Sequence, residues 1–214
     1  MAIKETMKDE SREILIAEFE YIASTANQAN EDRARVSSFY LIAVGSLIAA
    51  LFSTQLLDAK FDMQMLNILL AVLFFVLTIL GTLTIVQLAR LRGACFESML
   101  AMNQIKEYII SKDKDAAKAF RWRTTTAPKL YKINSISYQQ TIEVAILSTL
   151  TFGAAAYCFQ NGIGYNSPIY NWLYTIASAL LAFIGQLNIY KRLIISEEKR
   201  IHLPDTIIIK KKRT

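Results

Sequence analysis

Seven basic residues and one tryptophan lie close together in the middle of the chain. They are Lys112, Lys114, Lys118, Arg121, Trp122, Arg123, Lys129 and Lys132. Only two acids, Asp113 and Asp115, lie among them. Arg and Lys neutralise phosphate groups, and the flat face of an indole ring stacks on a nucleobase. This segment is therefore a candidate site for an anionic ligand such as a nucleotide or an oligonucleotide.

Two other interpretations of the same segment stay open. Loops on the cytoplasmic side of membrane proteins carry an excess of Lys and Arg, so the charge could serve only to orient the chain, with Trp122 as a packing residue. Anionic lipid head groups would attract the same charges. The basic residues at 210–213 are expected to act as a simple tether to such head groups.

Long uncharged blocks predict the structural class. Residues 36–57, 63–89 and 144–190 contain no charged residue. The last block is divided at 160–168 by a turn sequence that is rich in Gly and Asn and ends with Pro168. A membrane-spanning helix needs about 20 apolar residues. We therefore predict an all-α membrane protein with four transmembrane helices, at residues 37–57, 64–89, 142–162 and 170–191.

The distribution of basic residues predicts the orientation of these spans. All 24 Lys and Arg residues except Lys60 fall in residues 1–36, in residues 90–141 or after residue 190. Segments rich in Lys and Arg stay on the cytoplasmic side. Aromatic residues typical of the opposite interface cluster just before and at the start of the fourth span: Tyr165, Tyr170, Trp172 and Tyr174. We expect a multi-pass protein of the inner (plasma) membrane with both termini in the cytoplasm and the lipid bilayer as a partner.

The segments beside the spans are predicted to extend them as a cytoplasmic helical bundle. Residues 1–36 form an amphipathic helix, residues 90–141 a basic helical segment and residues 192–214 a polybasic tail. Within these segments, one helix is expected to start near Lys129 after Pro128, and the last helix to end before Pro204. The apolar faces comprise Leu15, Phe19, Ile22, Ala26 and Ala29 in the first segment, and Cys95, Met99, Met102, Ile105 and Ile109 in the second.

Polar side chains inside the predicted spans are candidates to line a pore. They are Thr78, Thr82 and Gln87 in the second span, and Ser178, Gln186 and Asn188 in the fourth. Hydroxyl and amide groups at membrane depth either hydrogen-bond between helices or face water. No ionisable residue lies near the middle of a span, which counts against a proton-coupled or ion-coupled carrier.

Small residues recur at helical spacing in three of the spans. They include Gly45 and Ala49, then Ala145, Gly153 and Ala156, then Ser178, Ala182 and Gly185. Such stripes let helices approach closely, either within one protomer or between protomers. A homo-oligomer is therefore an expected form of the protein.

Residues for catalysis are scarce. The chain has one histidine, His202, and two cysteines, Cys95 and Cys158, none of which is adjacent in sequence to another. No nucleophile–base pair or metal-ligand spacing is visible. We therefore predict no catalytic residues, no metal site and no cofactor, and we expect that the protein is not an enzyme.

Residues 27–40 (NQANEDRARVSSFY) lead from an acidic helix into the first span. Together with the count of four spans, they resemble small bacterial membrane proteins that act as effectors in antiphage defence, including those of the Hailong and Kiwa systems. The resemblance implies an oligomeric membrane effector or sensor whose channel opens, or whose partner is released, during infection. It also implies a nucleotide or nucleic-acid ligand at the basic segment, and it transfers no functional residue.

Two functions follow from these observations. The first is an oligomeric effector that forms a gated channel or pore, controlled through its basic cytoplasmic region by an anionic ligand or partner, in bacterial antiphage defence. The alternative is a non-conducting membrane scaffold that recruits a soluble partner protein. A small carrier is a third possibility, and the lack of ionisable residues in the spans and of an internal repeat argues against it.

Overall fold

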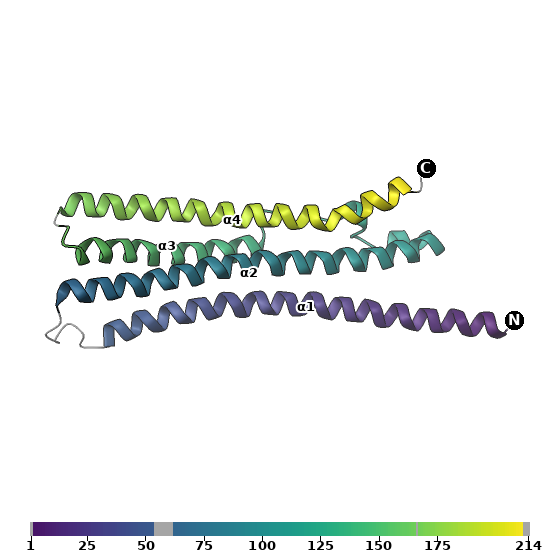
Figure 1. Ribbon diagram of the computed structural model, residues 1–214. Helices are drawn as coiled ribbons and strands as arrows, with labels where there is room; N and C mark the ends of the chain where they lie inside the picture. Colours follow the sequence, from purple (N-terminus) through teal and green to yellow (C-terminus); the bar gives the residue numbers. More distant parts are fainter. Residues whose placement is uncertain (1, 54–61, 166, 212–214) are drawn as a thin grey trace. The chain divides into compact units, whose positions relative to one another are not determined.

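A computed structural model describes residues 2–53, 62–165 and 167–211 of the chain. Four long α-helices make up most of it: α1 (Ala2–Ser53), α2 (Met63–Lys112), α3 (Ile136–Gly162) and α4 (Pro168–Lys211). Two short 3-10 helices, η1 (Asp115–Lys118) and η2 (Thr124–Thr126), lie between α2 and α3 in sequence. The part of the chain that is described contains no strand (Figure 1).

Each of the four helices is long and apolar enough to cross a membrane. The predicted spans fall one in each helix, in chain order, except that residues 54–57 lie outside the described part. The prediction of an all-helical chain with four candidate membrane-spanning helices is therefore confirmed. The inner-membrane location and the cytoplasmic position of both termini stay predictions.

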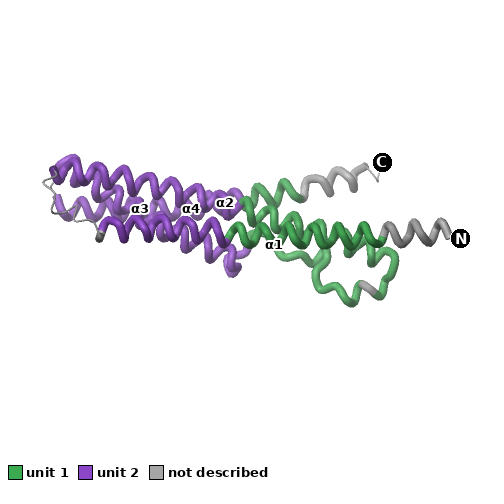
Figure 2. Tube along the Cα trace, turned by 90° about the horizontal axis from the view of Figure 1, so that it is seen from below, with its two compact units in different colours: residues 1–33, 90–131, 194–214 green, residues 34–89, 132–193 purple. Residues whose placement is uncertain are grey.

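The chain divides into two compact units (Figure 2). Unit 1 comprises Met1–Arg33, Arg90–Tyr131 and Ile194–Thr214. Unit 2 comprises Ala34–Ala89 and Lys132–Leu193. All four apolar blocks predicted as spans belong to unit 2, whereas most of the charged residues of the chain belong to unit 1.

Unit 2 has a core in which small and hydroxyl-bearing residues bring the helices close together. A Cβ atom placed on Gly81 of α2 would lie 2.5 Å from Ser148 Oγ and 2.6 Å from the Tyr40 hydroxyl, so only glycine fits there. On α3, a Cβ at Gly153 would lie 3.6 Å from the Cβ of Ala179 on α4. The small-residue face of the third span therefore packs within the protomer.

Unit 1 has a core that includes part of the predicted α1 face, whereas the predicted α2 face is at most half-buried and its Ile109 is exposed. Ile22, Ala26 and Ala29 of α1 are buried, as are Phe96 of α2 and Ile194 of α4. The spacing of three and four residues places the three α1 side chains on one side of the helix. Most exposed residues of α1 between 12 and 33 are polar, and the large exceptions are Ile14, Ile16, Phe19 and Tyr21.

The connection between α2 and α3 differs from the prediction. The helix expected from about Lys129 begins only at Ile136, and the side chain of Ser135 caps it by accepting a hydrogen bond from Tyr138 N at 3.2 Å. Asn134 and Ser135 favour turns and caps over helix interiors, so the cap forms here rather than after Pro128. The basic segment at 90–141 is therefore helical only in its first and last parts.

The end of the last helix also differs from the prediction. The helix expected to end before Pro204 continues to Lys211. Proline removes one backbone donor and clashes with the preceding turn, which can kink a helix without ending it. By contrast, the turn expected at 160–168 is confirmed, because α3 ends at Gly162, α4 begins at Pro168 and Gly164 has a φ of +76°.

Candidate functional site

The predicted anion-binding segment follows the end of α2 as two 3-10 turns and irregular backbone. Seven of its eight candidate residues are exposed, and Arg123 is half-buried. All belong to unit 1 except Lys132, which belongs to unit 2. Because most of these side chains are exposed, the shape of the loop depends on the few that bond to the rest of unit 1.

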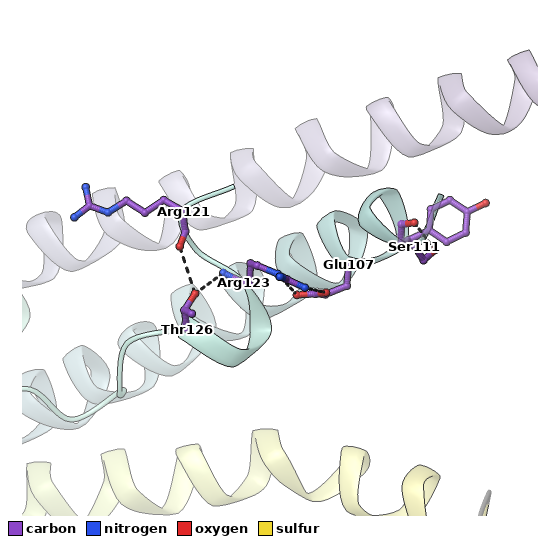
Figure 3. Close-up of polar contacts among 6 residues, drawn as sticks. Glu107, Ser111, Arg121, Arg123 and Thr126 are labelled. Atoms are coloured by element: carbon purple, nitrogen blue, oxygen red, sulfur yellow. Dashed lines mark hydrogen bonds and ion pairs between the residues drawn. The ribbon is translucent and has the colours of Figure 1, made fainter. Parts of the chain in front are cut away.

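Arg123 ties the loop to α2. Its Nε and Nη2 atoms donate to the two carboxylate oxygens of Glu107 at 3.0 and 2.8 Å, which forms a two-pronged ion pair (Figure 3). The hydrogen bond from Arg123 lowers the pKa of Glu107, and the same bond raises the pKa of Arg123. Arg123 is thus committed to a partner inside the protein, although the sequence predicted it as a ligand-binding residue.

Thr126 closes the turn that carries the two arginines. Its Oγ1 accepts a hydrogen bond from Arg123 N at 2.9 Å and donates to the Arg121 carbonyl oxygen at 3.3 Å. The side chain of Arg121 extends away from Arg123 and from Glu107 (Figure 3). The two arginines therefore do not converge on one site: one holds the loop and the other is presented at the surface.

The remaining basic residues lie along the surface of the loop. Lys118 Nζ pairs with Asp115 at 3.0 Å, with both side chains highly exposed. Lys112 Nζ lies 5.6 Å from the centre of the Tyr108 ring. Lys114, Lys129 and Trp122 are exposed, the indole to 54% of its surface. The arrangement is an exposed, positively charged surface that includes the Trp122 ring.

A groove in unit 1 was not anticipated as a site from the sequence. It has a volume of about 530 Å³. Its apolar lining comes from Leu15, Ile16 and Phe19 of α1, Ile105 and Ile109 of α2, and Phe120 of the loop. The sequence pattern did contain an indication of this groove, because four of its lining residues belong to the apolar faces identified on the first and second helices.

Charged residues also contribute to the lining of this groove. Arg12 and Glu20 of α1 and Lys106 of α2 contribute to its lining. The Lys106 ammonium lies 5.9 Å from the centre of the Phe120 ring and donates to Asn103 Oδ1 at 3.3 Å. Two of these three charged residues are basic, so the groove suits an apolar segment that carries carboxylates.

In unit 2, three of the six pore candidates lie inside the helical bundle. Thr78 and Gln186 are 7% and 4% exposed, and Thr82 is half-buried. They join Ser148 and Thr151 of α3, which sequence analysis did not single out. We name these five residues the polar network.

Hydrogen bonds within the polar network connect three helices. Ser148 Oγ and Thr82 Oγ1 both donate to the Thr78 carbonyl oxygen, at 3.2 and 3.0 Å. Their protons are thereby used, so both oxygens accept from Gln186 Nε2, at 2.7 and 3.2 Å. Thr78 Oγ1 and Thr151 Oγ1 lie 3.1 Å apart. The network therefore holds α2, α3 and α4 together.

The remaining helix of the bundle, α1, contributes Tyr40 to the same region. This side chain is 1% exposed, and its hydroxyl lies against those of Ser148 and Thr151 without reaching hydrogen-bond geometry to either. Gln186 Oε1 is also buried without a hydrogen-bond partner among the described atoms. Thus each hydroxyl group of the polar network has a hydrogen-bond partner, whereas Gln186 Oε1 and the neighbouring Tyr40 hydroxyl have none among the described atoms.

The other three pore candidates have different surroundings. Ser178 Oγ donates to the carbonyl oxygen of Thr175 in its own helix at 3.0 Å. Gln87 and Asn188 are exposed on the surface of unit 2. Residues of the same type in the same spans therefore face the interior in some cases and the surroundings in others.

Groups that could hold a metal ion were sought among the described residues, and no cluster of three or more His, Cys, Asp or Glu residues was found. The predicted lipid tether at 210–213 lies outside the described side chains. Comparison with known proteins identifies no relative, since no family model, no curated protein and no solved structure matches the chain.

Proposed function

We propose that the chain is a membrane-anchored scaffold that recruits an anionic soluble partner through the surface of residues 112–132. The observation that carries this proposal is that different side chains of the loop have different roles. Arg123 and Thr126 fix its shape, while Arg121, Trp122 and Lys129 stay exposed. A fixed basic surface in the same chain as a membrane anchor is suited to binding a partner from solution.

The geometry favours a broad partner over a small nucleotide. Small-molecule sites are usually concave and enclose most of their ligand. Here Lys112 and Lys118 lie beside groups of the protein itself, and Arg121 points away from Arg123. Charges spread over an exposed loop match the acidic surface of a protein, which meets several of them at once.

The arrangement of unit 2 supports an anchor rather than a permanent channel. Thr78, Thr82 and Gln186 hydrogen-bond inside the bundle instead of facing a water-filled path. Large apolar residues such as Phe39, Leu150 and Leu181 are exposed on the outside of this unit, as expected for contact with lipid. Such a bundle holds its helices together without any conducting role.

Purification from native membranes tests the scaffold. The wild-type chain is expected to bring down a second protein in a fixed ratio, and the variant with Lys114→Glu, Arg121→Glu and Lys129→Glu is expected to lose it. Lys199→Glu, an exposed charge reversal elsewhere in unit 1, is the control and should retain it. Retention of the second protein by the triple variant would overturn the proposal. If the co-purified component is instead removed by nuclease, the ligand of this surface is a nucleic acid and not an acidic protein.

A gated pore between protomers is the second candidate, and it is the form in which an antiphage effector would act. Two observations on unit 2 favour it. Gln87 and Asn188 are exposed on its surface. Gly45 and Gly185 have open space where a side chain would be, so neighbouring protomers can approach closely there. Discrete currents from the purified protein that disappear with Gln87→Leu and Asn188→Leu would support this function.

A further inference from the structure

We propose that the groove of unit 1 binds the outward face of helix α1 from a second copy of this chain, so that neighbouring copies join head to tail. The outward face consists of Ile14, Ala17 and Tyr21, with Glu13 and Glu18 beside them. All five side chains are exposed. This interface shares Phe120 with the loop at 112–132 but uses none of the basic residues of that loop.

Helix α1 presents two different apolar faces in unit 1. Successive residues turn by about 100° around a helix of 3.6 residues per turn. Leu15, Ile16 and Phe19 thus lie on the side that lines the groove, while Ile14 and Tyr21 lie on roughly the opposite side. Ile14 is 68% exposed and Tyr21 is 69% exposed. One segment therefore carries both a receptor surface and a free apolar stripe.

The charges of the two surfaces are complementary. Arg12 and Lys106 contribute to the lining of the groove, and Glu20 is the single acid there. Glu13 and Glu18 flank the apolar stripe of the outward face, and no basic residue lies between them in sequence. Docking the stripe into the groove brings carboxylates toward an ammonium and a guanidinium group while it covers large apolar side chains.

Two features favour a second copy as the occupant over an unrelated helix. The chain itself supplies a matching segment, so every copy carries one groove and one face. Copies anchored in the same membrane also meet at a high effective concentration and in the same orientation. Because the two surfaces differ, the contact is heterologous, and repetition of it generates a closed ring or a row.

Complementary defects in two variants test this geometry with the full-length protein in detergent. One variant carries Ile14→Glu and Tyr21→Glu on the outward face. The other carries Ile16→Glu and Ile109→Glu in the groove, two positions that are themselves 50% and 38% exposed. Because all four positions are at least partly exposed, both variants are expected to keep the wild-type helix content by circular dichroism.

Native mass spectrometry or light scattering then gives the copy number. The wild type is expected to be oligomeric, each variant alone monomeric, and a mixture of the two a dimer with one copy of each. That 1:1 dimer is specific to a head-to-tail contact, because one intact groove meets one intact face. A monomeric wild type, variants of wild-type size, or a mixture that stays monomeric would each overturn the proposal.

Discussion

The two units of the chain distribute polar and apolar side chains in opposite ways. In unit 2, Thr78, Ser148 and Gln186 are buried and bonded to one another, while Phe39 and Leu181 are exposed. In unit 1, the basic residues of the loop are exposed, and the unusual feature is exposed apolar side chains such as Ile14 and Tyr21. Buried polar residues in unit 2 and exposed apolar residues in unit 1 therefore need an explanation. Exposed apolar residues in unit 2 and exposed basic residues in unit 1 are expected.

This difference changes how polar residues in a predicted span should be interpreted. Where lipid surrounds a helix, a hydroxyl or amide group finds its partners on neighbouring helices. The polar network follows that rule, so the presence of Thr and Gln in a span is not by itself a sign of a pore. The substitutions below test whether the network is structural, in order of decreasing expected effect.

Gly81→Ala is expected to have the largest effect. The added Cβ would lie 2.5 Å from Ser148 Oγ and 2.6 Å from the Tyr40 hydroxyl, so helices α1 and α3 must shift away from α2. Overpacking of this kind costs about 1–3 kcal/mol. Thermal unfolding in detergent measures it. Gly185→Ala is the matched control, with no atom within 4 Å of the added carbon, and it should leave the melting temperature unchanged or slightly raised.

Gln186→Leu is expected to have the next largest effect. It removes both hydrogen bonds that join α4 to Thr82 and Ser148. Interhelical hydrogen bonds in membranes are worth about 0.6 kcal/mol each on average, so a loss of about 1–2 kcal/mol is expected in the same unfolding assay. The exposed Asn188→Leu serves as the control and should cost less. Equal stability of Gln186→Leu and wild type would show that the network does not hold the helices together.

Arg123→Ala is expected to loosen the loop without unfolding the protein. Because the side chain bonds Glu107 through two nitrogen atoms, its removal frees the turn that carries Arg121 and Trp122. Hydrogen exchange of residues 113–126 should become faster, while exchange in α3 stays as in wild type. Arg121→Ala is the control, and unchanged exchange is expected for it. Equal exchange in both variants would mean that the ion pair does not shape the loop.

The same ion pair makes the loop sensitive to acid. The pKa of Glu107 is lower in the folded protein than its ordinary value, so the pair contributes fully above the ordinary pKa of glutamate. Its contribution is lost as the pH falls through the lowered folded value. Loop exchange, corrected for its intrinsic pH dependence, should therefore accelerate only at acid pH. Glu107→Gln should abolish that transition, and an identical transition in this variant would exclude Glu107 as its cause.

Much of the fold was predictable because charge is costly inside a span. The uncharged blocks at 36–57, 63–89 and 144–190 located all four helices. The start of α3 was not predicted, because a local choice between Pro128 and Ser135 as the helix start depends on the cap that forms. Extension of α4 past Pro204 was missed because proline, although it lacks a backbone donor and clashes with the preceding turn, can kink a helix without ending it.

For the candidate sites, the sequence indicated which residue types take part but not which side chains are buried or bonded. Thr78 and Gln87 are both polar residues of α2, yet one is buried and the other exposed. Both sides of a span are apolar, so spacing alone does not tell which side faces the other helices. Similarly, Arg121 and Arg123 are separated by one residue and look equivalent in the sequence. Only Arg123 bonds Glu107, which lies 16 residues earlier in the sequence.

The most direct test of the account is the conductance of the purified, reconstituted protein in planar bilayers. It should be recorded with and without an oligonucleotide on the side that carries the basic loop. The scaffold account predicts no discrete currents in either condition, because Thr78, Thr82 and Gln186 bond to one another inside the bundle. Discrete currents whose amplitude changes with Gln186→Leu would contradict it and would assign the polar network to an ion path.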